Sequence, residues 1–358
     1  MTRPLSAGKL RGLARMAGPD GRFRMVAVDP RPPLFAALAR ARGVSEDALD
    51  HFEIAEAKAL LVRTLAEDAS AMLLDPTWAH PAALLDLPGA TGLLSTLESH
   101  AFERVDGERR SRPIEGWSVA KARRCGADAV KVLVWDRPDA HEATRAHQDD
   151  FVRAAGDACR RHDLPFVLEI LEYPRPEEDP RDPAFLAGKP DRVTASLAHY
   201  ADPAFGVDLF KVQLPVDLAH VEGFDGDRLD GATGEPIWRA EEARAWVARM
   251  DELSPVPWVL LSAGVGPRTF EAGLRLALEA GASGFLAGRA VWLDALAAWP
   301  DRDAVTAALR AGSGPYLRSI GVLAEAGVPW FDHPRFGGDP RLADAGPGWA
   351  QAYGEDPG

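Results

Sequence analysis

Two lysines stand inside otherwise apolar stretches of the 358-residue chain. Lys131 lies in Ala-Val-Lys-Val-Leu-Val, and Lys211 lies in Asp-Leu-Phe-Lys-Val-Gln-Leu. An unpaired ammonium buried in an apolar stretch is costly, so each lysine must be paired or deprotonated. A partly desolvated lysine near a second cation has a lowered pKa, and its neutral amine can attack a carbonyl carbon to form a Schiff base. The pair therefore predicts Schiff-base chemistry in which one lysine lowers the pKa of the other.

A structural role is the alternative for both lysines. Each could form a buried salt bridge with Asp29, Glu169 or Asp208, or the strand register could turn one of them outward. Glu169 lies in the apolar stretch Phe-Val-Leu-Glu-Ile-Leu, where burial raises the pKa of a carboxyl group and makes it a candidate general acid or base. The alternative for Glu169 is an ion-pair partner that holds a lysine in place.

Two glycine-containing turns near the C-terminus predict an anion site. Ser262 and Gly264 follow one apolar run in Leu-Ser-Ala-Gly-Val, and Gly288 and Arg289 follow the next in Ala-Gly-Arg-Ala. In α/β barrels, such turns after the seventh and eighth strands commonly bind phosphate through backbone N–H groups, and an arginine adds a bidentate contact. Arg31, in Asp-Pro-Arg-Pro-Pro, is a candidate for a second anion, and a plain surface arginine fits that position equally well.

These residues recur at one place in a repeating pattern, in which a short apolar run precedes a helical segment. Most of the runs lack strict alternation, which is typical of parallel strands buried on both faces. The runs are Phe23–Val28, Ala71–Leu74, Gly92–Leu97, Ala129–Val134, Phe166–Ile170, Leu209–Leu214, Trp258–Leu261 and Gly284–Ala287. The polar residues in or just after them are Asp29, Asp75, Glu98, Lys131, Glu169, Lys211, Ser262 and Arg289. Eight strands alternating with helices favour a (β/α)8 barrel, whose chemistry lies at the carboxyl ends of its strands.

The intervening segments complete the predicted domain. Helical periodicity is clearest at Glu46–Asp68, Asp139–His162, Ala240–Leu253 and Arg268–Ala280. We predict an N-terminal extension over residues 1–20, one barrel over 21–328 and a loop-rich, Gly/Pro-rich C-terminal extension over 329–358, which we expect to be loosely packed. Residues 173–190 are dense in proline and charge, and we expect a long loop over one mouth of the barrel. Trp135 and Trp292 follow strand ends and are candidates to line the pocket.

Composition excludes several classes of protein. With 41 Lys+Arg and 54 Asp+Glu the formal net charge is −13, which argues against nucleic-acid binding. No run approaches the roughly 18 apolar residues of a membrane helix, and the N-terminus has no apolar signal core, so we expect neither a membrane partner nor export. Two cysteines without a CxxC spacing fit a reducing cytoplasm best. The nine histidines show no HxH or HExxH spacing, so we expect no metal.

Taken together, the motifs resemble the class I tagatose-1,6-bisphosphate aldolases and their relatives, which include sulfofructosephosphate aldolases. Six stretches match in the family's order and span roughly residues 20 to 300: Cys125-Gly-Ala-Asp-Ala-Val-Lys-Val-Leu, Leu164-Pro-Phe-Val-Leu-Glu-Ile-Leu-Glu-Tyr, Val207-Asp-Leu-Phe-Lys-Val-Gln-Leu-Pro-Val, His220-Val-Glu-Gly-Phe, Leu260-Leu-Ser-Ala-Gly-Val and Ala287-Gly-Arg-Ala-Val-Trp. The resemblance implies a (β/α)8 barrel that cleaves or forms a carbon–carbon bond between dihydroxyacetone phosphate and an aldehyde without a metal.

The resemblance also implies roles for individual residues. Lys211 matches the Schiff-base lysine and Glu169 the acid/base, with Lys131 and Asp29 assisting in the site. The positions that hold a phosphate in the family are here Ser262, Gly264, Gly288 and Arg289.

Three stretches depart from the family pattern. Asp-Gln-Arg-Gly becomes Asp29-Pro-Arg-Pro-Pro, Ala-Tyr-Glu-Lys becomes Ser95-Thr-Leu-Glu-Ser99, and Val-Glu-Val-Pro becomes Val212-Gln-Leu-Pro215. These changes leave the Schiff-base residues in place and concern the aldehyde partner.

We therefore expect a class I aldolase, a lyase that needs no cofactor beyond its own lysine and that converts a tagatose-1,6-bisphosphate-like ketose phosphate to dihydroxyacetone phosphate and an aldehyde. One alternative is a Schiff-base decarboxylase or dehydratase acting on another keto substrate. Another is a non-catalytic sensor that binds a sugar phosphate. The expected partner is a phosphorylated sugar, and a homo-oligomer is expected only because barrel enzymes often self-associate.

Overall fold

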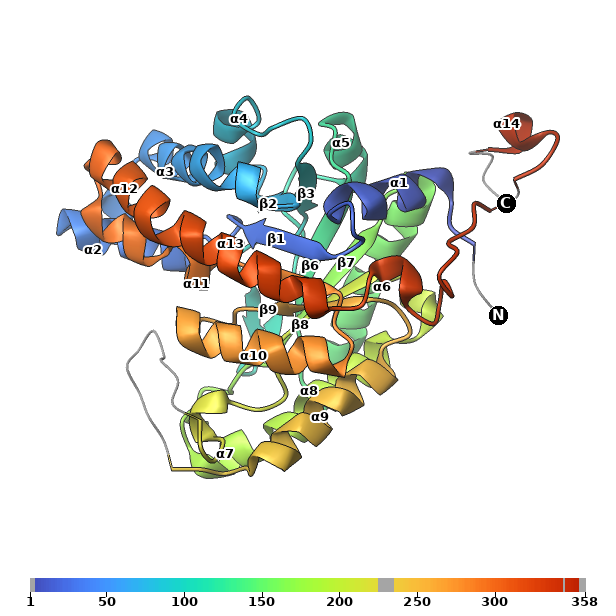
Figure 1. Cartoon of the computed structure of the whole chain (residues 1–358). Helices are drawn as coiled ribbons and strands as arrows, with labels where there is room; N and C mark the ends of the chain where they lie inside the picture. The colour runs from blue at the N-terminus through green and yellow to red at the C-terminus, as the bar shows by residue number, and fades with distance from the viewer. Residues whose placement is uncertain (1–3, 225–234, 344, 354–358) are drawn as a thin grey trace.

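Eight parallel strands close into a barrel surrounded by helices (Figure 1). The computed structural model describes residues 4–224, 235–343 and 345–353. Around the barrel the order is β1-β2-β3-β6-β7-β8-β9-β10, with β10 closing on β1. The strands are β1 (Phe23–Ala27), β2 (Ala71–Leu74), β3 (Gly92–Thr96), β6 (Ala129–Trp135), β7 (Phe166–Leu171), β8 (Leu209–Val212), β9 (Trp258–Leu261) and β10 (Gly284–Ala287). The predicted barrel and its eight strands are confirmed.

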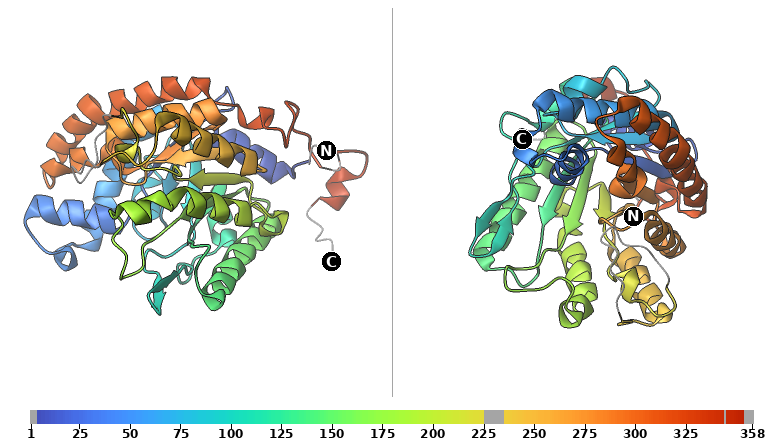
Figure 2. Two further views of the ribbon diagram at one scale, coloured as in Figure 1. Left: turned by 90° about the horizontal axis from the view of Figure 1, so that it is seen from below. Right: turned by 90° about the vertical axis from the view of Figure 1, so that its left-hand side faces the viewer.

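Helices cover the outside of the barrel in every view (Figure 2). They are α2 (Pro32–Arg42), α3 (His51–Leu65), α4 (Ala79–Ala83), α5 (Val119–Arg124), α6 (Glu142–Arg161), α7 (Pro183–Ala187), α8 (Lys189–Tyr200), α9 (Ala240–Leu253), α10 (Pro267–Ala280), α11 (Arg289–Trp292), α12 (Arg302–Ala308) and α13 (Gly314–Leu323). Three of the four predicted helices agree to within a few residues. The fourth, predicted over 46–68, consists of η1 (Glu46–Ala48), α3 and η2 (Ala66–Asp68). Extended backbone angles at Leu49 and Asp50 separate η1 from α3, and η2 continues directly from the end of α3.

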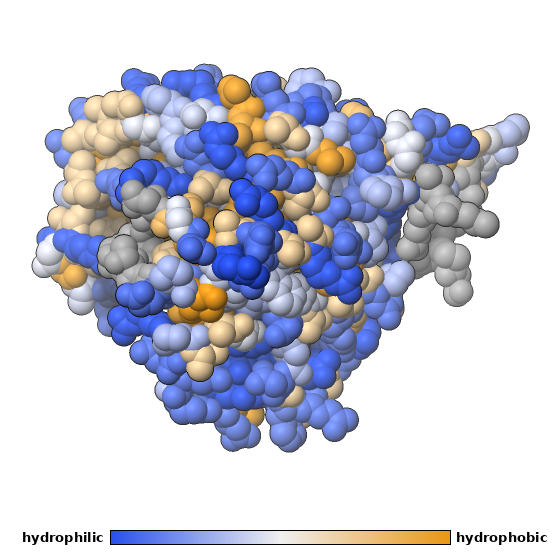
Figure 3. All heavy atoms as spheres, turned by 60° about the horizontal axis from the view of Figure 1, so that its bottom comes forward, coloured by the Kyte–Doolittle hydropathy of each residue, from blue (hydrophilic) through white to orange (hydrophobic). Residues whose placement is uncertain are grey.

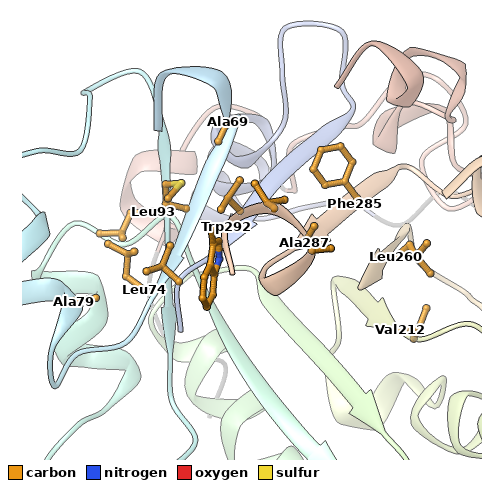
Figure 4. Close-up of a cluster of buried hydrophobic side chains, with 14 of the residues drawn as sticks. Ala69, Leu74, Ala79, Leu93, Val212, Leu260, Phe285, Ala287 and Trp292 are labelled. Carbon is orange, nitrogen blue, oxygen red and sulfur yellow. The ribbon is translucent and has the colours of Figure 1, made fainter. Parts of the chain in front are cut away.

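The alternation of side chains along each strand creates two apolar layers. Residues such as Met25, Leu73, Val167 and Leu209 fill the inside of the barrel, and their neighbours in sequence pack outward against the helices, as the cluster around Trp292 shows (Figure 4). Because strand side chains alternate with a period of two, every second residue towards the carboxyl end must also point into the barrel. This parity brings the polar residues at the strand ends together.

The amino end of the barrel is closed by segments from both ends of the chain. Helix α1 (Ala7–Met16) places Leu13 and Met16 against the interior layer, which also contains Trp330 and Phe336. The glycine at position 12 permits this packing, because a Cβ there would lie 2.2 Å from the Asp128 carbonyl oxygen. The expectation of a loosely packed tail is therefore wrong for its first residues. Residues 1–3, 344 and 354–358 of the two predicted extensions lie outside the described residues.

Two insertions lie at the carboxyl end. A hairpin of β4 (Glu103–Val105) and β5 (Glu108–Arg110) follows β3. Residues 173–190, predicted to be a long loop, contain α7 and begin with a segment that Arg137 holds by donating to the Tyr173 carbonyl oxygen and pairing with Glu178. The remaining short helical turns are η3 (Pro203–Phe205), η4 (Leu218–His220), η5 (Asp294–Ala298), η6 (Leu309–Ser313), η7 (Ala324–Ala326) and η8 (Trp330–Asp332), and α14 (Trp349–Ala352) lies near the C-terminus.

The outer surface is mostly polar. On the face shown in Figure 3, hydrophilic residues cover most of the area and apolar residues form small patches between them. Within the described residues, no helix is both long enough and apolar enough to span a membrane.

Candidate active site

The centre of the carboxyl end is a fully buried ammonium surrounded by carboxylates. The Nζ atom of Lys131, on β6, lies 2.7 Å from Asp29 Oδ2, 2.6 Å from Glu98 Oε1 and 3.1 Å from Glu169 Oε2. The three carboxylates follow or lie on β1, β3 and β7, and each is at least nine-tenths buried. Four different strands therefore contribute one charged side chain each to a single cluster.

Lys211 completes this cluster from β8. Its Nζ atom lies 2.9 Å from Glu169 Oε2, the same oxygen that contacts Lys131. The register explains the contact, because Glu169 on β7 is aligned with Lys211 on β8 and both side chains share the inward parity. The structure thus brings together four predicted residues, Lys131, Glu169, Lys211 and Asp29, and the alternative in which one lysine points outward is wrong.

The environment of Lys131 favours its charged form. Burial alone would lower the pKa of Lys131, but the carboxylates of Asp29, Glu98 and Glu169 outweigh burial and raise the pKa well above its ordinary value. Burial alone would raise the pKa of Asp29, and the positive charges of Lys131, Lys211 and Arg31 instead hold it well below its usual range. The surroundings therefore favour the ammonium form of Lys131 and the carboxylate form of Asp29.

Asp208 is the one proposed lysine partner that lies elsewhere. It precedes β8 at the amino end of the barrel, where its Oδ2 atom lies 2.7 Å from the Nζ atom of Lys9. Asp208 therefore lies at the opposite end of the barrel from Lys131 and Lys211 and pairs with neither of them. The salt-bridged alternative holds for Lys131 with Asp29 and Glu169 and for Lys211 with Glu169 only.

Arg31 is not a surface arginine. It is 5% exposed, and its two terminal nitrogens lie 3.2 Å from the carbonyl oxygen and from Oε1 of Glu98. Glu98 also accepts hydrogen bonds from Thr96 Oγ1 at 2.7 Å and from the Leu133 backbone N–H at 3.0 Å. Glu98 belongs to the strand-end residues noted in the sequence, and the structure makes it the link between Arg31 and Lys131.

The two glycine-containing turns lie side by side. The hydroxyl of Ser262 accepts a hydrogen bond from the Gly288 backbone N–H at 3.3 Å, which ties the turn after β9 to the turn after β10. Gly264 has a φ of 82°, and a Cβ there would lie 2.9 Å from both terminal nitrogens of Arg289. The left-handed backbone at position 264 favours glycine, and the missing side chain leaves room for the Arg289 guanidinium.

Arg289 differs from Arg31 because it makes no hydrogen bond or ion pair with any residue in the described ranges. Burial lowers the pKa of Arg289, while Glu169 and Asp29 act in the opposite direction. An arginine left without an acceptor at the edge of a cavity has its donors available for a ligand.

Two adjoining cavities open at this end. One, of about 330 Å³, is lined by Asp29, Arg31, Glu98, Trp135, Glu169, Lys211, Ser262, Gly288 and Arg289. The other, of about 970 Å³, shares Ser262 and Arg289 with the first and extends past Gly264 to the segment around α7. Trp135 lines the smaller cavity as expected. Trp292 lies in the apolar layer outside the strands and donates its indole N–H to the Ala27 carbonyl oxygen.

Lys58 is the charged residue that the sequence reasoning missed. It is fully buried on α3, and its Nζ atom donates to the carbonyl oxygens of Val28 and Pro30 and pairs with Asp75. A signal was present, since Ile54, Lys58 and Leu61 share one face of a helix whose apolar residues are buried.

No group of three or more His, Cys, Asp and Glu side chains within the described residues is arranged to hold a metal ion. The carboxylates of the cluster are instead occupied by Lys131, Lys211 and Arg31. The chemistry available to this set of groups is that of an amine, carboxylates and an anion site.

Comparisons with known proteins identify the family of the chain. Residues 35–294 match the DeoC/LacD family aldolases. The tagatose 1,6-diphosphate aldolase of Listeria monocytogenes is 30% identical over 332 residues, which is 91% of this chain and 95% of that protein. The enzyme of the same name from Streptococcus pneumoniae is 32% identical over 289 residues, covering 80% of this chain and 85% of the relative.

Solved structures share the fold at lower sequence identity. An archaeal fructose 1,6-bisphosphate aldolase has a TM-score of 0.52 and 16% identity, and the match covers 88% of this chain and 98% of that one. A fructose-bisphosphate aldolase from Plasmodium falciparum has a TM-score of 0.64 and 14% identity, covering 91% and 97%. With the family match extending over most of the barrel, the chain belongs to the DeoC/LacD family of aldolases and is a lyase of the aldolase class.

Proposed function

We propose that this aldolase is a class I enzyme that forms a Schiff base on Lys211 and acts on a ketose phosphate of the tagatose 1,6-bisphosphate type. The observation that carries the proposal is the unequal pair of lysines on one carboxylate oxygen. Lys131 is held by three carboxylates and lies away from the cavity walls, whereas Lys211 contacts Glu169 and lines the cavity. Of these two lysines, Lys211 is therefore the one placed to meet a substrate carbonyl.

The proposed reaction starts with proton transfer from the Lys211 ammonium to Glu169, whose Oε2 atom is 2.9 Å away. The neutral amine attacks the ketone carbon, and the resulting carbinolamine loses water to form an iminium. Glu169 supplies the proton that leaves with the water.

Carbon–carbon cleavage then follows from the electron-withdrawing iminium. A carboxylate removes the proton of the C4 hydroxyl, the C3–C4 bond breaks, the aldehyde leaves and the electron pair remains as an enamine on Lys211. Protonation of the enamine and addition of water release dihydroxyacetone phosphate and restore the amine. Because the iminium accepts the electrons, this route needs no metal.

Lys131 and Asp29 have electrostatic and hydrogen-bonding roles in this scheme. The fixed charge of Lys131 keeps Glu169 and Asp29 close together, although two carboxylates side by side would otherwise repel. Asp29 also lines the cavity and is placed to accept a hydrogen bond from a substrate hydroxyl.

We assign the phosphate of the ketose to the turns around Ser262, Gly264 and Gly288, with Arg289 supplying the charge. The shared position of Ser262 and Arg289 between the two cavities supports this assignment. Arg31 is retained as a candidate for the second anion of the substrate, although its terminal nitrogens would have to exchange part of their contact with Glu98.

Borohydride trapping tests the mechanism. In the presence of dihydroxyacetone phosphate, reduction should add the three-carbon phosphate to Lys211, which peptide mass spectrometry locates. The control is Lys131→Met, which removes the other lysine of the site. It is used once circular dichroism shows that the variant is folded. Absence of an adduct at Lys211 in the folded native protein would rule out the Schiff base, and a panel of fructose, tagatose and sulfofructose phosphates then identifies the substrate. Trapping with a keto acid in place of a ketose phosphate would favour the decarboxylase or dehydratase alternative.

A further inference from the structure

A fully buried ion pair lies behind the loop that carries Asp29. Lys58 and Asp75 are both 0% exposed, and Lys58 Nζ lies 2.6 Å from Asp75 Oδ2. The same ammonium donates to the carbonyl oxygen of Val28 at 2.6 Å and to that of Pro30 at 3.2 Å. Since these two residues flank Asp29, one side chain holds the backbone on both sides of it.

The loop needs such a donor because its own backbone has few. In Asp29-Pro-Arg-Pro-Pro, three of the five residues are prolines, which have no N–H to donate. The regular ladder continues only to the Val28 N–H, which donates to the Leu73 carbonyl oxygen at 2.9 Å. Beyond that point the carbonyl groups of Val28 and Pro30 are held by Lys58, whereas that of Arg31 accepts from the Phe35 backbone N–H at 2.9 Å.

Asp75 fixes the ammonium in turn. Its second oxygen accepts hydrogen bonds from the backbone N–H groups of Thr77 and Trp78 at 3.0 and 2.9 Å. Burial lowers the pKa of Lys58, and the charge of Asp75 opposes this. A buried ion pair is weak evidence for stability, since apolar residues of similar size often serve as well. The hydrogen bonds from Lys58 to the Val28 and Pro30 carbonyl groups indicate that the pair positions the loop.

We propose that Lys58 and Asp75 are positioning residues for Asp29, a role that rests on the Schiff-base function proposed above. They hold the Val28 and Pro30 carbonyl groups so that the Asp29 carboxylate stays against Lys131. Lys58 lines neither cavity and contacts none of the proposed reacting groups, so its effect on turnover is indirect. Asp29 in turn is one of three carboxylates that keep Lys131 charged beside Glu169.

Two charge-neutral double variants test the proposal. Lys58→Met with Asp75→Asn removes the donor, and the asparagine oxygen can still accept from Thr77 and Trp78. Lys58→Gln with Asp75→Asn also removes both charges but leaves an amide N–H near the two carbonyl groups. We expect kcat to fall about 10- to 100-fold in the methionine variant, as expected for a misplacement on the order of 1 Å, and to fall less in the glutamine variant. The KM for the phosphate-bearing substrate should change little, because the turns around Ser262 and Arg289 are untouched.

The pH profile separates positioning from a general loss of stability. An Asp29 carboxylate that is less firmly held against Lys131 takes up a proton more readily, so the acidic limb of kcat should move to higher pH. The matched control is Lys9→Met with Asp208→Asn, which removes a lysine–aspartate pair at the amino end of the barrel whose side chains are 12% and 2% exposed. This control should keep the native pH profile even if its melting temperature falls.

Unchanged kcat and an unchanged acidic limb in the folded methionine variant would overturn the proposal, as would equal losses in the control. If the methionine variant does not fold, the same comparison is made with the glutamine variant. Borohydride trapping of the native protein is run alongside. An adduct at Lys211 with no effect of the variants rejects only the positioning role, whereas no adduct in the native protein rejects the Schiff-base function itself.

Discussion

The two ends of the barrel use the same strands in opposite ways. At the amino end, inward residues such as Phe23 and Leu209 belong to one buried apolar cluster with Leu13 and Trp330. At the carboxyl end, the same inward parity presents charged residues, among them Lys131, around a cavity of about 330 Å³. The apolar end can supply the stability that allows buried charges to persist at the other end. Stability and reactivity are thus separated along the barrel axis, and each should respond to different substitutions.

The largest effect on reactivity is expected from Lys211→Met. Removing the nucleophile should lower turnover by at least about 10³-fold, because Lys211 is the only lysine among the described residues that line the smaller cavity. The melting temperature should stay close to that of the native protein, since a buried ammonium is replaced by an apolar side chain. Steady-state cleavage assays and thermal unfolding measure both quantities. Turnover within tenfold of the native value would show that the charged end does not work through Lys211.

The largest effect on stability is expected from Trp330→Ala at the amino end. Trp330 is 3% exposed and packs edge-on against Phe331 and Phe336. Its removal should lower the free energy of unfolding by about 3–5 kcal/mol, as for other buried aromatic side chains. At 25 °C the folded fraction should keep native kcat and native trapping at Lys211. A large loss of kcat in folded protein would contradict the separation of the two ends.

A smaller effect is expected from Arg289→Met, which tests the proposed phosphate contact at the carboxyl end. Loss of a charge-assisted contact of about 1.5–3 kcal/mol corresponds to a rise in KM of about 10- to 100-fold. The effect should appear with phosphorylated ketoses and be small with an unphosphorylated analogue. Arg31→Met is the variant for comparison, because the Arg31 guanidinium is already paired with Glu98. Equal effects of Arg289→Met on both substrates would argue against a phosphate at this position.

The smallest effect is expected from acidification, and it compares a buried histidine at each end. Burial lowers the pKa of His80, which follows β2, and of His333, which lies beside Trp330. Below about pH 6.5 the unfolded chain takes up protons that the folded protein binds less readily, so stability is present above that pH and is lost as the pH falls. Each unit of pKa difference corresponds to about 1.4 kcal/mol. Urea unfolding between pH 5 and 7.5 should show this slope, and His80→Phe should reduce it.

Much of the barrel could be predicted from the sequence because its strands are short apolar runs with polar ends. The same pattern placed Lys131, Glu169 and Lys211 on neighbouring strands, and their spacing relative to the apolar residues gave them a common face. Periodicity could not show that Arg31 is buried, because that depends on Glu98 from another strand.

Other features depend on contacts between segments far apart in the chain. The tail from Pro329 has no regular pattern, yet Trp330 is buried because the open amino end of the barrel accepts it. Lys58 lies on a helix, and the pattern of polar residues at strand ends does not include helix residues. Its position on the apolar face of α3 was the available signal, and its partners Val28, Pro30 and Asp75 lie 17 to 30 residues away.

The alignment of Glu169 with Lys211 between β7 and β8 has a consequence for how such an enzyme can change over time. Adding or deleting one residue within β8 would turn Lys211 towards the helices and Phe210 towards the cavity, which would destroy the packing and the site in a single event. The strands are therefore closed to changes of length. New aldehyde preferences must arise in the segments beyond the strand ends, such as the β4–β5 hairpin and residues 173–190, where insertions leave the register of the barrel intact.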